Sequence, residues 1–247
     1  MSEKNKSLTP DPSTEAVSGR HSKKAVVLFS GGLDSATALY WTRKQGYQPY
    51  CLIVDYGQRQ RREIESAEKI AKQEKLPYEI IHSIFPWQGS ALLNHQSNVP
   101  KHRSFEEMSA GIPSTYVPAR NIFFLSLALS WGEVIGASAL VIGANQIDWS
   151  GYPDCRGEFF TAFDKVIQTG TKTGVEGSPI QILTPLLSKT KAEIVLLGNQ
   201  LGVPFGGTWS CYEGKESPCG ECDSCQLREK GFESAGIIDP LFINSRK

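Results

Sequence analysis

Residues 30–35 carry the backbone and side chains best suited to chemistry in this sequence. Their letters are SGGLDS, and they lie between the apolar run at residues 25–29 and a helix-forming stretch that begins near Ser35. This order predicts a buried strand, a glycine turn and the first turn of a helix. Two glycines let the backbone approach a ligand, and the start of the helix presents free N–H groups and a positive dipole. We therefore expect the turn to bind phosphate, with Ser30 and Ser35 as hydroxyl donors.

The residue types of this loop exclude the two commonest nucleotide-binding motifs. A kinase-type loop needs a glycine, four residues and then Gly-Lys-Ser/Thr, but the residue five after Gly31 is Ala36, and the turn holds no lysine. The dinucleotide pattern G-x-G-x-x-G does not occur here either. A glycine-rich joint without a ligand is the structural alternative. Asp34 would repel a phosphate, so we expect it to bind a bridging Mg²⁺ or to lie at the helix start, where a carboxylate is favourable.

The same loop resembles the pyrophosphate loop of the N-type ATP pyrophosphatases. Enzymes of that family cut ATP between its α- and β-phosphates and activate a substrate as an adenylate. The resemblance implies that the loop holds the leaving pyrophosphate and that Asp34 and Ser35 take part in catalysis. The ATP-binding residues that it implies are Phe29, Ser30, Gly31, Gly32, Leu33, Asp34, Ser35, Ala36, Thr37, Ala38 and Leu39.

Four of the six cysteines form a second group, with the spacing of a metal site. They are Cys211, Cys219, Cys222 and Cys225, in the pattern C-x7-C-x2-C-x2-C. Two overlapping CxxC turns supply three thiolates to one ion and the first cysteine completes a tetrahedron, which predicts a structural Zn²⁺ site. An iron–sulfur cluster and disulfides are the alternatives. Cys51 lies in an apolar strand and is expected to be a small buried hydrophobe, whereas Cys155 lies among polar residues.

Apolar runs alternate with helical patterns along the sequence, and these elements must position the two groups. Strands are expected at residues 25–29, 49–54, 78–82, 139–142 and 180–184, and helices at residues 35–45, 60–74, 120–135, 157–169 and 189–200. This alternation favours an α/β fold with a doubly wound parallel sheet, in which ligands bind at the carboxyl ends of the strands. Residues 86–116 fit neither pattern, and we expect a long loop that serves as a lid or a dimer contact.

The composition limits the class of protein. The 247 residues contain 26 Lys and Arg against 26 Asp and Glu, so the formal net charge is zero. A protein that binds tRNA usually carries a basic surplus, because neutralised phosphates supply most of the affinity. Residues 1–22 are polar and predict a flexible tail rather than a signal peptide, and the most apolar window, residues 122–129, is too short to span a membrane. We expect a cytoplasmic protein with a tail (1–22), an ATP-binding domain (23–208) and a cysteine-bearing segment (209–247).

Several further polar motifs lie at the ends of expected strands, where an α/β sheet builds its site. Together with the loop and the cysteines, they are similar to the 7-cyano-7-deazaguanine synthase family from about residue 24 to about residue 232. The motifs that carry the resemblance are FSGGLDSATAL, DYGQR, VPARN, SGYPDCR and WSCY…PCGECDSC…R…GF. That family belongs to the pyrophosphate-loop group, so the resemblance implies a Rossmann-like fold of the adenine-nucleotide alpha hydrolase type.

The resemblance implies an ATP-dependent ligase that converts 7-carboxy-7-deazaguanine and ammonia into a nitrile on the path to queuosine, a modified tRNA base. The acid would be adenylated, converted to an amide and activated again. The resemblance further implies one Zn²⁺ per chain and a homodimer. We also expect Mg²⁺ with the ATP, and neither nucleic acid nor a membrane as partner. Lys189 and Arg120 are expected to balance phosphate charge. The residues expected to bind the deazaguanine by its N–H edge, its ring or its carboxylate are Asp148, Tyr152, Asp154 and Arg156.

Two other functions fit parts of the sequence. A tRNA-modifying member of the same loop family would thiolate a base or attach lysine to it. Thiolation needs a reactive cysteine pair, and outside the metal group only Cys51 and Cys155 remain. The neutral charge also argues against a tRNA-binding surface. The other alternative is a zinc-binding adaptor whose loop no longer hydrolyses ATP, against which the complete loop and the polar strand ends weigh.

Overall fold

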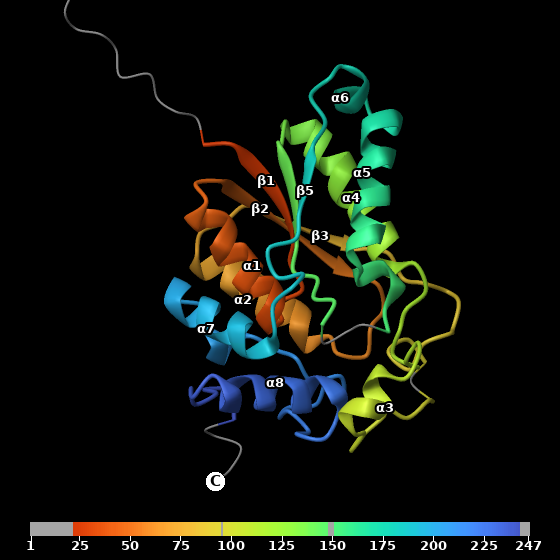
Figure 1. Ribbon diagram of the computed structural model, residues 1–247, viewed down its shortest axis with the longest axis vertical. Coiled ribbons are helices and arrows are strands. Elements are labelled where there is room, and N and C mark those ends of the chain that lie inside the picture. The colour runs from red at the N-terminus through yellow and green to blue at the C-terminus, as the bar shows by residue number, and fades with distance from the viewer. Residues whose placement is uncertain (1–21, 95, 148–150, 243–247) are drawn as a thin grey trace, which may run out of the picture.

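Five parallel strands form a sheet in the order β3-β2-β1-β4-β5 (Figure 1). They are β1 (Lys24–Leu28), β2 (Gln48–Asp55), β3 (Tyr78–His82), β4 (Ala139–Ile142) and β5 (Gln181–Leu183). The computed structural model describes residues 22–94, 96–147 and 151–242. All five expected strands are confirmed, with bounds shifted by a residue or so. Because the strand order reverses beside β1, the topological switch point lies between β1 and β4, where a doubly wound sheet binds its ligand.

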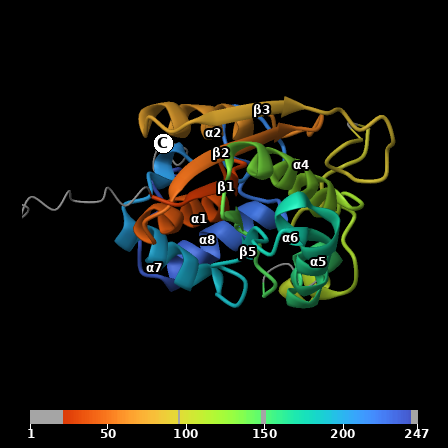
Figure 2. The same ribbon diagram turned by 90° about the horizontal axis from the view of Figure 1, so that it is seen from above.

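Helices cover both faces of this sheet, as Figure 2 shows, with α1, α2 and α7 on one side and α4 and α5 on the other. The helices are α1 (Leu33–Lys44), α2 (Arg62–Gln73), α3 (Phe105–Ser109), α4 (Arg120–Ile135), α5 (Gly157–Gly170), α6 (Lys172–Val175), α7 (Lys191–Leu201) and α8 (Asp223–Ser234), with 3-10 turns η1 (Pro153–Cys155) and η2 (Phe205–Gly207). The doubly wound α/β architecture predicted from the sequence is therefore confirmed. Among the described helices, none has the length and hydropathy that crossing a bilayer requires.

Two hydrophobic cores follow from the alternation of side chains along the central strands. Val27 of β1 packs in one core with Leu39 of α1 and Ile194 of α7. Val26 points to the opposite face and packs in the second core with Leu125 of α4. Parallel strands covered on both faces need apolar residues at successive positions, which explains the uninterrupted apolar run of β1.

The C-terminal segment adds a helix that the sequence patterns did not predict. Helix α8 packs against α7, and its Phe232 meets Phe205 edge-to-face with ring centroids 5.1 Å apart. Phe232 thereby joins the core that also contains α1 and α7. Residues 86–116 are mostly irregular, as expected, and approach the cysteine segment through a bridge between Lys101 and Cys222. The predicted tail lies outside the described residues, except for Ser22.

Candidate active site

The glycine turn after β1 is held in contact with the start of helix α2. Gly31 has a φ of +83°, and a Cβ on it would lie 2.3 Å from the carbonyl oxygen of Glu63. Only glycine permits both the conformation and this approach. Gly32 then forms the N-cap of α1. The hydroxyl of Ser35 donates to the Gly32 carbonyl over 3.1 Å and lies 3.1 Å from the hydroxyl of Ser30. The two hydroxyls and the start of α1 therefore share one place, as phosphate binding requires.

The turn forms one wall of a cavity of about 230 Å³ at the carboxyl ends of β1, β2 and β4. The ends of these strands contribute Leu28, Val54 and Ile142. Aromatic rings form much of the remaining lining: Tyr56, Phe124, Tyr152, Trp209 and Tyr212. A cavity with polar loop groups on one wall and aromatic rings on another suits a planar ligand that meets phosphates.

Residues 29–39, expected to bind ATP, divide between the cavity and the core. Those that line the cavity are Phe29, Ser30, Gly32, Leu33, Asp34 and Ser35. Outside the lining, Gly31 is buried against α2, and the residues buried in α1 are Ala36, Thr37, Ala38 and Leu39. The hydroxyl of Thr37 is bonded to the Leu33 carbonyl over 2.9 Å within the helix. The second turn of α1 thus supports the loop by packing.

Lys191, rather than Lys189, is the lysine that lines the cavity. Its Nζ lies 2.8 and 2.9 Å from the two carboxylate oxygens of Asp34. Helix α7 begins at Lys191 because Thr190 is its N-cap and forms a capping box with Glu193. Lys189 therefore precedes the helix, and its carbonyl oxygen accepts a hydrogen bond from Asn145.

Arg120, the first residue of α4, supplies a second cation to the cavity. Its Nε is buried and has no hydrogen-bond partner among the described residues. Burial lowers the pKa of the guanidinium, but Tyr56, Tyr152 and Asp154 outweigh it, so the pKa stands above its usual range. Arg120 is therefore charged at any physiological pH and presents an unpaired N–H that suits an anionic ligand group.

Of the four residues expected to bind the deazaguanine, Tyr152 is the one that the structure places in the cavity lining. Its hydroxyl lies 2.8 Å from that of Thr115, and its ring centroid is 5.7 Å from that of Tyr116. Asp148 lies outside the described residues.

Asp154 and Arg156 are not among the residues that line the cavity. The Asp154 carboxylate accepts a hydrogen bond from the backbone N–H of Asn121 over 3.0 Å, so it holds the start of α4. Arg156 is exposed at the start of α5, where its guanidinium lies 3.9 Å from Glu158.

Sequence reasoning missed Glu63, which lines the cavity beside the glycine turn. Burial raises the pKa of Glu63 to about 7, although Arg120 and the amide of Gln58 oppose the shift. Nothing in the local pattern of α2 identifies this residue, because its burial depends on the packing of α2 against Gly31. A carboxyl group that titrates near neutrality inside a cavity suits proton transfer.

The two cysteines outside the four-cysteine cluster are expected to be unreactive. Cys51 is fully buried within β2, as predicted, and burial raises the pKa of its thiol to about 12. Cys155 lines the cavity, and burial, assisted by Asp154, raises the pKa of its thiol to about 12. Both thiols are therefore protonated near pH 7, which disfavours a role as nucleophile.

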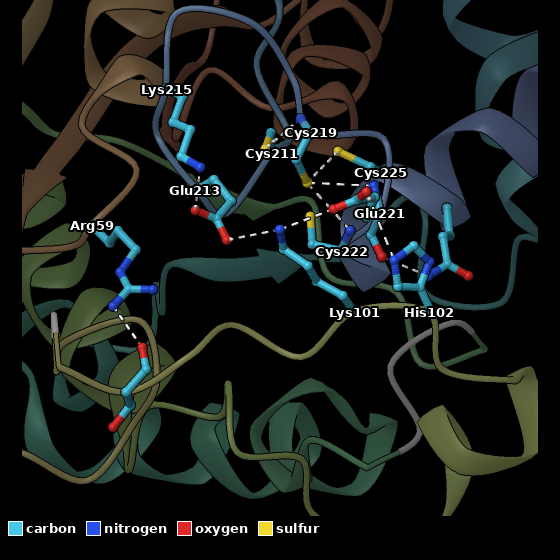
Figure 3. Close-up of polar contacts among 12 residues, drawn as sticks. Arg59, Lys101, His102, Cys211, Glu213, Lys215, Cys219, Glu221, Cys222 and Cys225 are labelled. Carbon is cyan, nitrogen blue, oxygen red and sulfur yellow. Dashed lines mark hydrogen bonds and ion pairs between the residues drawn. The ribbon is translucent and has the colours of Figure 1, made fainter.

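The four remaining cysteines converge on one point (Figure 3). The sulfur atoms of Cys211, Cys219, Cys222 and Cys225 all lie within 4.8 Å of one another. Those of Cys219 and Cys225 are 3.9 Å apart, close to the roughly 3.8 Å that two ligands of a tetrahedral ion with 2.3 Å bonds would show. Backbone N–H groups of Cys219 and Cys222 donate to sulfur over 3.3 Å. This cluster can hold a metal ion.

A group of charged residues joins the cysteine segment to the loop at residues 86–116 (Figure 3). The Lys101 ammonium lies 2.9 Å from a Glu221 carboxylate oxygen and 3.6 Å from Glu213. The backbone N–H of His102 donates to the Glu221 carbonyl over 3.0 Å. Arg59 holds the same loop from the other side, because its guanidinium donates to the carbonyls of Asn94 and Ser97. These contacts therefore connect the cysteine segment to this loop.

Comparison with known proteins gives one consistent family. The model of "Queuosine biosynthesis protein QueC" matches residues 24–236. The 7-cyano-7-deazaguanine synthase of Trichodesmium erythraeum is 50% identical over 220 residues, covering 88% of this chain and 99% of the relative. That of Saccharophagus degradans is also 50% identical, over 222 residues and 96% of its own length, with 88% of this chain covered.

A likeness to solved structures is more distant. The NMN synthetase of Francisella tularensis aligns with a TM-score of 0.45 and 16% identity over 87% of this chain and 78% of its own. A likeness at this level carries no functional information. The family match over most of the chain, together with two relatives at half identity, decides the assignment: the chain belongs to the QueC family of queuosine biosynthesis proteins.

Proposed function

We propose that this protein is a 7-cyano-7-deazaguanine synthase, which uses ATP and ammonia to convert 7-carboxy-7-deazaguanine into the nitrile. The observation that carries the proposal is that the SGGLDS turn and Lys191 share one cavity with aromatic rings and Arg120. Family membership supplies the substrate class. In the proposal, the ATP phosphates and a planar acid would meet in this cavity.

The glycine turn at residues 30–35 and Lys191, here called the phosphate wall, suit the first step, in which ATP activates the carboxylate. A carboxylate is a poor acylating agent, so its oxygen attacks the α-phosphorus of ATP, the bond to the β-phosphate oxygen breaks, and pyrophosphate leaves. The backbone N–H groups at the start of α1 and the hydroxyls of Ser30 and Ser35 would hold the departing pyrophosphate. Lys191 would balance its charge, and Asp34 would orient Lys191. Mg²⁺, for which Asp34 is the carboxylate of the loop, would neutralise further phosphate charge.

The aromatic wall suits the deazaguanine. Tyr152, Phe124 and Tyr212 offer ring faces and edges for a bicyclic base, and Arg120 offers its unpaired N–H to the carboxylate that is activated. No protein nucleophile is needed, so catalysis consists of positioning and charge stabilisation. The raised thiol pKa of Cys51 and of Cys155 counts against the rival function of tRNA thiolation.

The cysteine cluster is proposed to hold one Zn²⁺. In a four-iron cluster each thiolate binds a different iron, which sets the sulfurs farther apart than around a single ion. Sulfurs within 4.8 Å of one another fit the single ion better. With four thiolates the ion has no open position, so its role is to hold the segment in place.

A second copy of the chain is the proposed macromolecular partner. Exposed apolar side chains gather after β3 and at the start of α4: Ile84, Trp87 and Ile122 are 74%, 55% and 45% exposed. Phe85 stacks on Trp87 and meets Phe123 edge-to-face, so these side chains form one surface. Contiguous apolar surface of this kind usually marks an interface. Light scattering should show a dimer, and Trp87→Glu should shift it towards the monomer; a monomeric wild type would refute this part.

The activity itself has a direct test. The purified protein is incubated with ATP, Mg²⁺, isotopically labelled ammonium and 7-carboxy-7-deazaguanine, and the products are identified by mass spectrometry. We expect the labelled nitrile and pyrophosphate, with the amide as an intermediate. Omission of each component in turn is the control. Folded, zinc-loaded protein that makes no nitrile refutes the proposal.

A further inference from the structure

Glu63 lines the cavity beside the glycine turn. It is the second residue of α2, whose start packs on the glycine turn because Gly31 carries no Cβ. Both Glu63 and the turn line the same cavity.

The carboxylate of Glu63 is oriented by a fixed neighbour. The side-chain oxygen of Gln58 accepts from the backbone N–H of Tyr56 over 2.9 Å, and its nitrogen donates to the Val54 carbonyl over 3.3 Å. These bonds fix the Gln58 amide so that the same nitrogen donates to Oε1 of Glu63 over 3.2 Å. The other oxygen, Oε2, makes no hydrogen bond within the described residues. One oxygen is thus held, and the other is left for a ligand.

Gln60 supplies a second acceptor to the same cavity. The residue is only 3% exposed, and its Oε1 is buried without a partner in the described part of the chain. A buried carbonyl oxygen without a partner is costly, so its presence points to a ligand that donates hydrogen bonds. Gln60 is adjacent to Glu63, because the Gln60 carbonyl accepts the backbone N–H of Glu63 over 3.1 Å.

The groups around Glu63 leave its pKa near 7. Arg120 at the start of α4 lowers its pKa, as does Gln58, but burial dominates and raises the pKa to about 7. Tyr56 is protonated, because burial raises its own pKa to about 12. The remaining charges of the cavity walls are paired, as in Asp34 with Lys191 and Arg228 with Asp239. The guanidinium of Arg62, on the helix of Glu63, lies over the ring of Trp209.

We propose that Glu63 and Gln60 form the ammonium site of the enzyme, in which Glu63 takes a proton to release ammonia beside the activated carboxyl group. Ammonium has four N–H donors and no acceptor, which matches two unpaired acceptor oxygens. This inference rests on the proposed function, because it needs an acyl-adenylate in the cavity.

The step balances without a further reagent. Glu63 accepts one proton from ammonium, and the freed lone pair forms the C–N bond at the acyl-adenylate carbonyl carbon. The bond from that carbon to the phosphate oxygen breaks, and AMP leaves with its electron pair. The second proton lost from nitrogen goes to the departing phosphate, whose second pKa is near 6. The product is the neutral amide, and Glu63 returns its proton to water.

The experiment compares two nucleophiles in Glu63→Gln. Hydroxylamine is largely unprotonated at pH 7 and traps an acyl-adenylate as a hydroxamate without a base, whereas ammonium must first lose a proton. We expect the variant to form hydroxamate within about threefold of the wild type and to lose about 100-fold or more of its rate with ammonium. Its remaining rate with ammonium should rise about tenfold per pH unit between pH 7 and 9, as free ammonia becomes available. Gln60→Leu should raise the KM for ammonium about tenfold with kcat largely kept.

The matched control is Glu65→Gln, in the same turn of α2 but exposed and outside the cavity lining. It should behave as the wild type with both nucleophiles. Equal loss with ammonium and hydroxylamine in Glu63→Gln, or an unchanged rate with ammonium, overturns the ammonium site while the proposed function stands. A wild type that forms no hydroxamate refutes the proposed function first, and the two failures are therefore distinguishable.

Discussion

Replacement of Lys191 by methionine tests the phosphate wall most directly. The Nζ of Lys191 lies 2.8 and 2.9 Å from the Asp34 oxygens, and the two side chains are only 11% and 22% exposed. The change removes a charge-assisted contact to the leaving pyrophosphate, about 1.5–3 kcal/mol, and leaves a carboxylate to repel it. Together, the lost contact and the repulsion should raise the activation free energy by about 3–4 kcal/mol, which corresponds to a fall in kcat/KM of about 100- to 1000-fold. The assay is pyrophosphate release in the presence of 7-carboxy-7-deazaguanine.

Two comparisons separate this role from a structural one. Lys191→Met should lower the free energy of unfolding by about 1–2 kcal/mol. This is less than the loss expected when one partner of a fully buried ion pair is removed, because both side chains retain some contact with water. Adding Asp34→Asn should recover that stability by removing the unpaired charge, but it should not recover activity. Lys189→Met is the matched control and should keep activity within about threefold of the wild type. If Lys189→Met is the inactive variant and Lys191→Met is active, the assignment of the cavity lysine is wrong.

Three further outcomes follow from the same geometry. Cys222→Ser should lower both the zinc content, measured by metal analysis, and the melting temperature, because the proposed ion holds α8 and the loop at residues 86–116. A normal zinc content with lost activity would contradict this prediction. Glu63→Gln should raise the melting temperature at pH 8 but not at pH 4. Burial raises the pKa of Glu63 from 4.5 to about 7, so the folded chain holds this proton more tightly than the unfolded chain, and that stabilisation is lost as the pH rises from about 4.5 to about 7. An equal effect at both pH values would point to packing instead. Cys155 should resist alkylation at pH 7 until the protein is denatured, because burial keeps its thiol protonated; mass spectrometry that shows fast modification of the native protein would contradict the buried position.

The elements that were predicted well are those whose buried faces produce a regular pattern of apolar residues in the sequence. Strand β1 is a continuous apolar run because both of its faces are covered, and α4 has the predicted bounds because Gly136 ends it in a left-handed conformation. Helix α8 lacks such an apolar pattern. Its buried residues include Asp223 and Arg228, whose charges are paired with Arg103 and Asp239. A helix that buries paired charges has no apolar stripe, so its pattern looked like that of a surface segment.

The site shows the same division between local and long-range causes. The conformation of the glycine turn was predictable because a strand, glycines and a following helix are adjacent in sequence. The lysine that lines the cavity is Lys191, two residues after the predicted Lys189, although a local signal for the start of α7, the capping box of Thr190 and Glu193, was present. Glu63 had no local signal at all: its place in the cavity depends on Gly31, more than thirty residues earlier in the sequence, which lets α2 reach the turn. Replacing Gly31 with alanine should therefore disturb the phosphate turn and Glu63 together, since the added methyl would meet the Glu63 carbonyl at 2.3 Å.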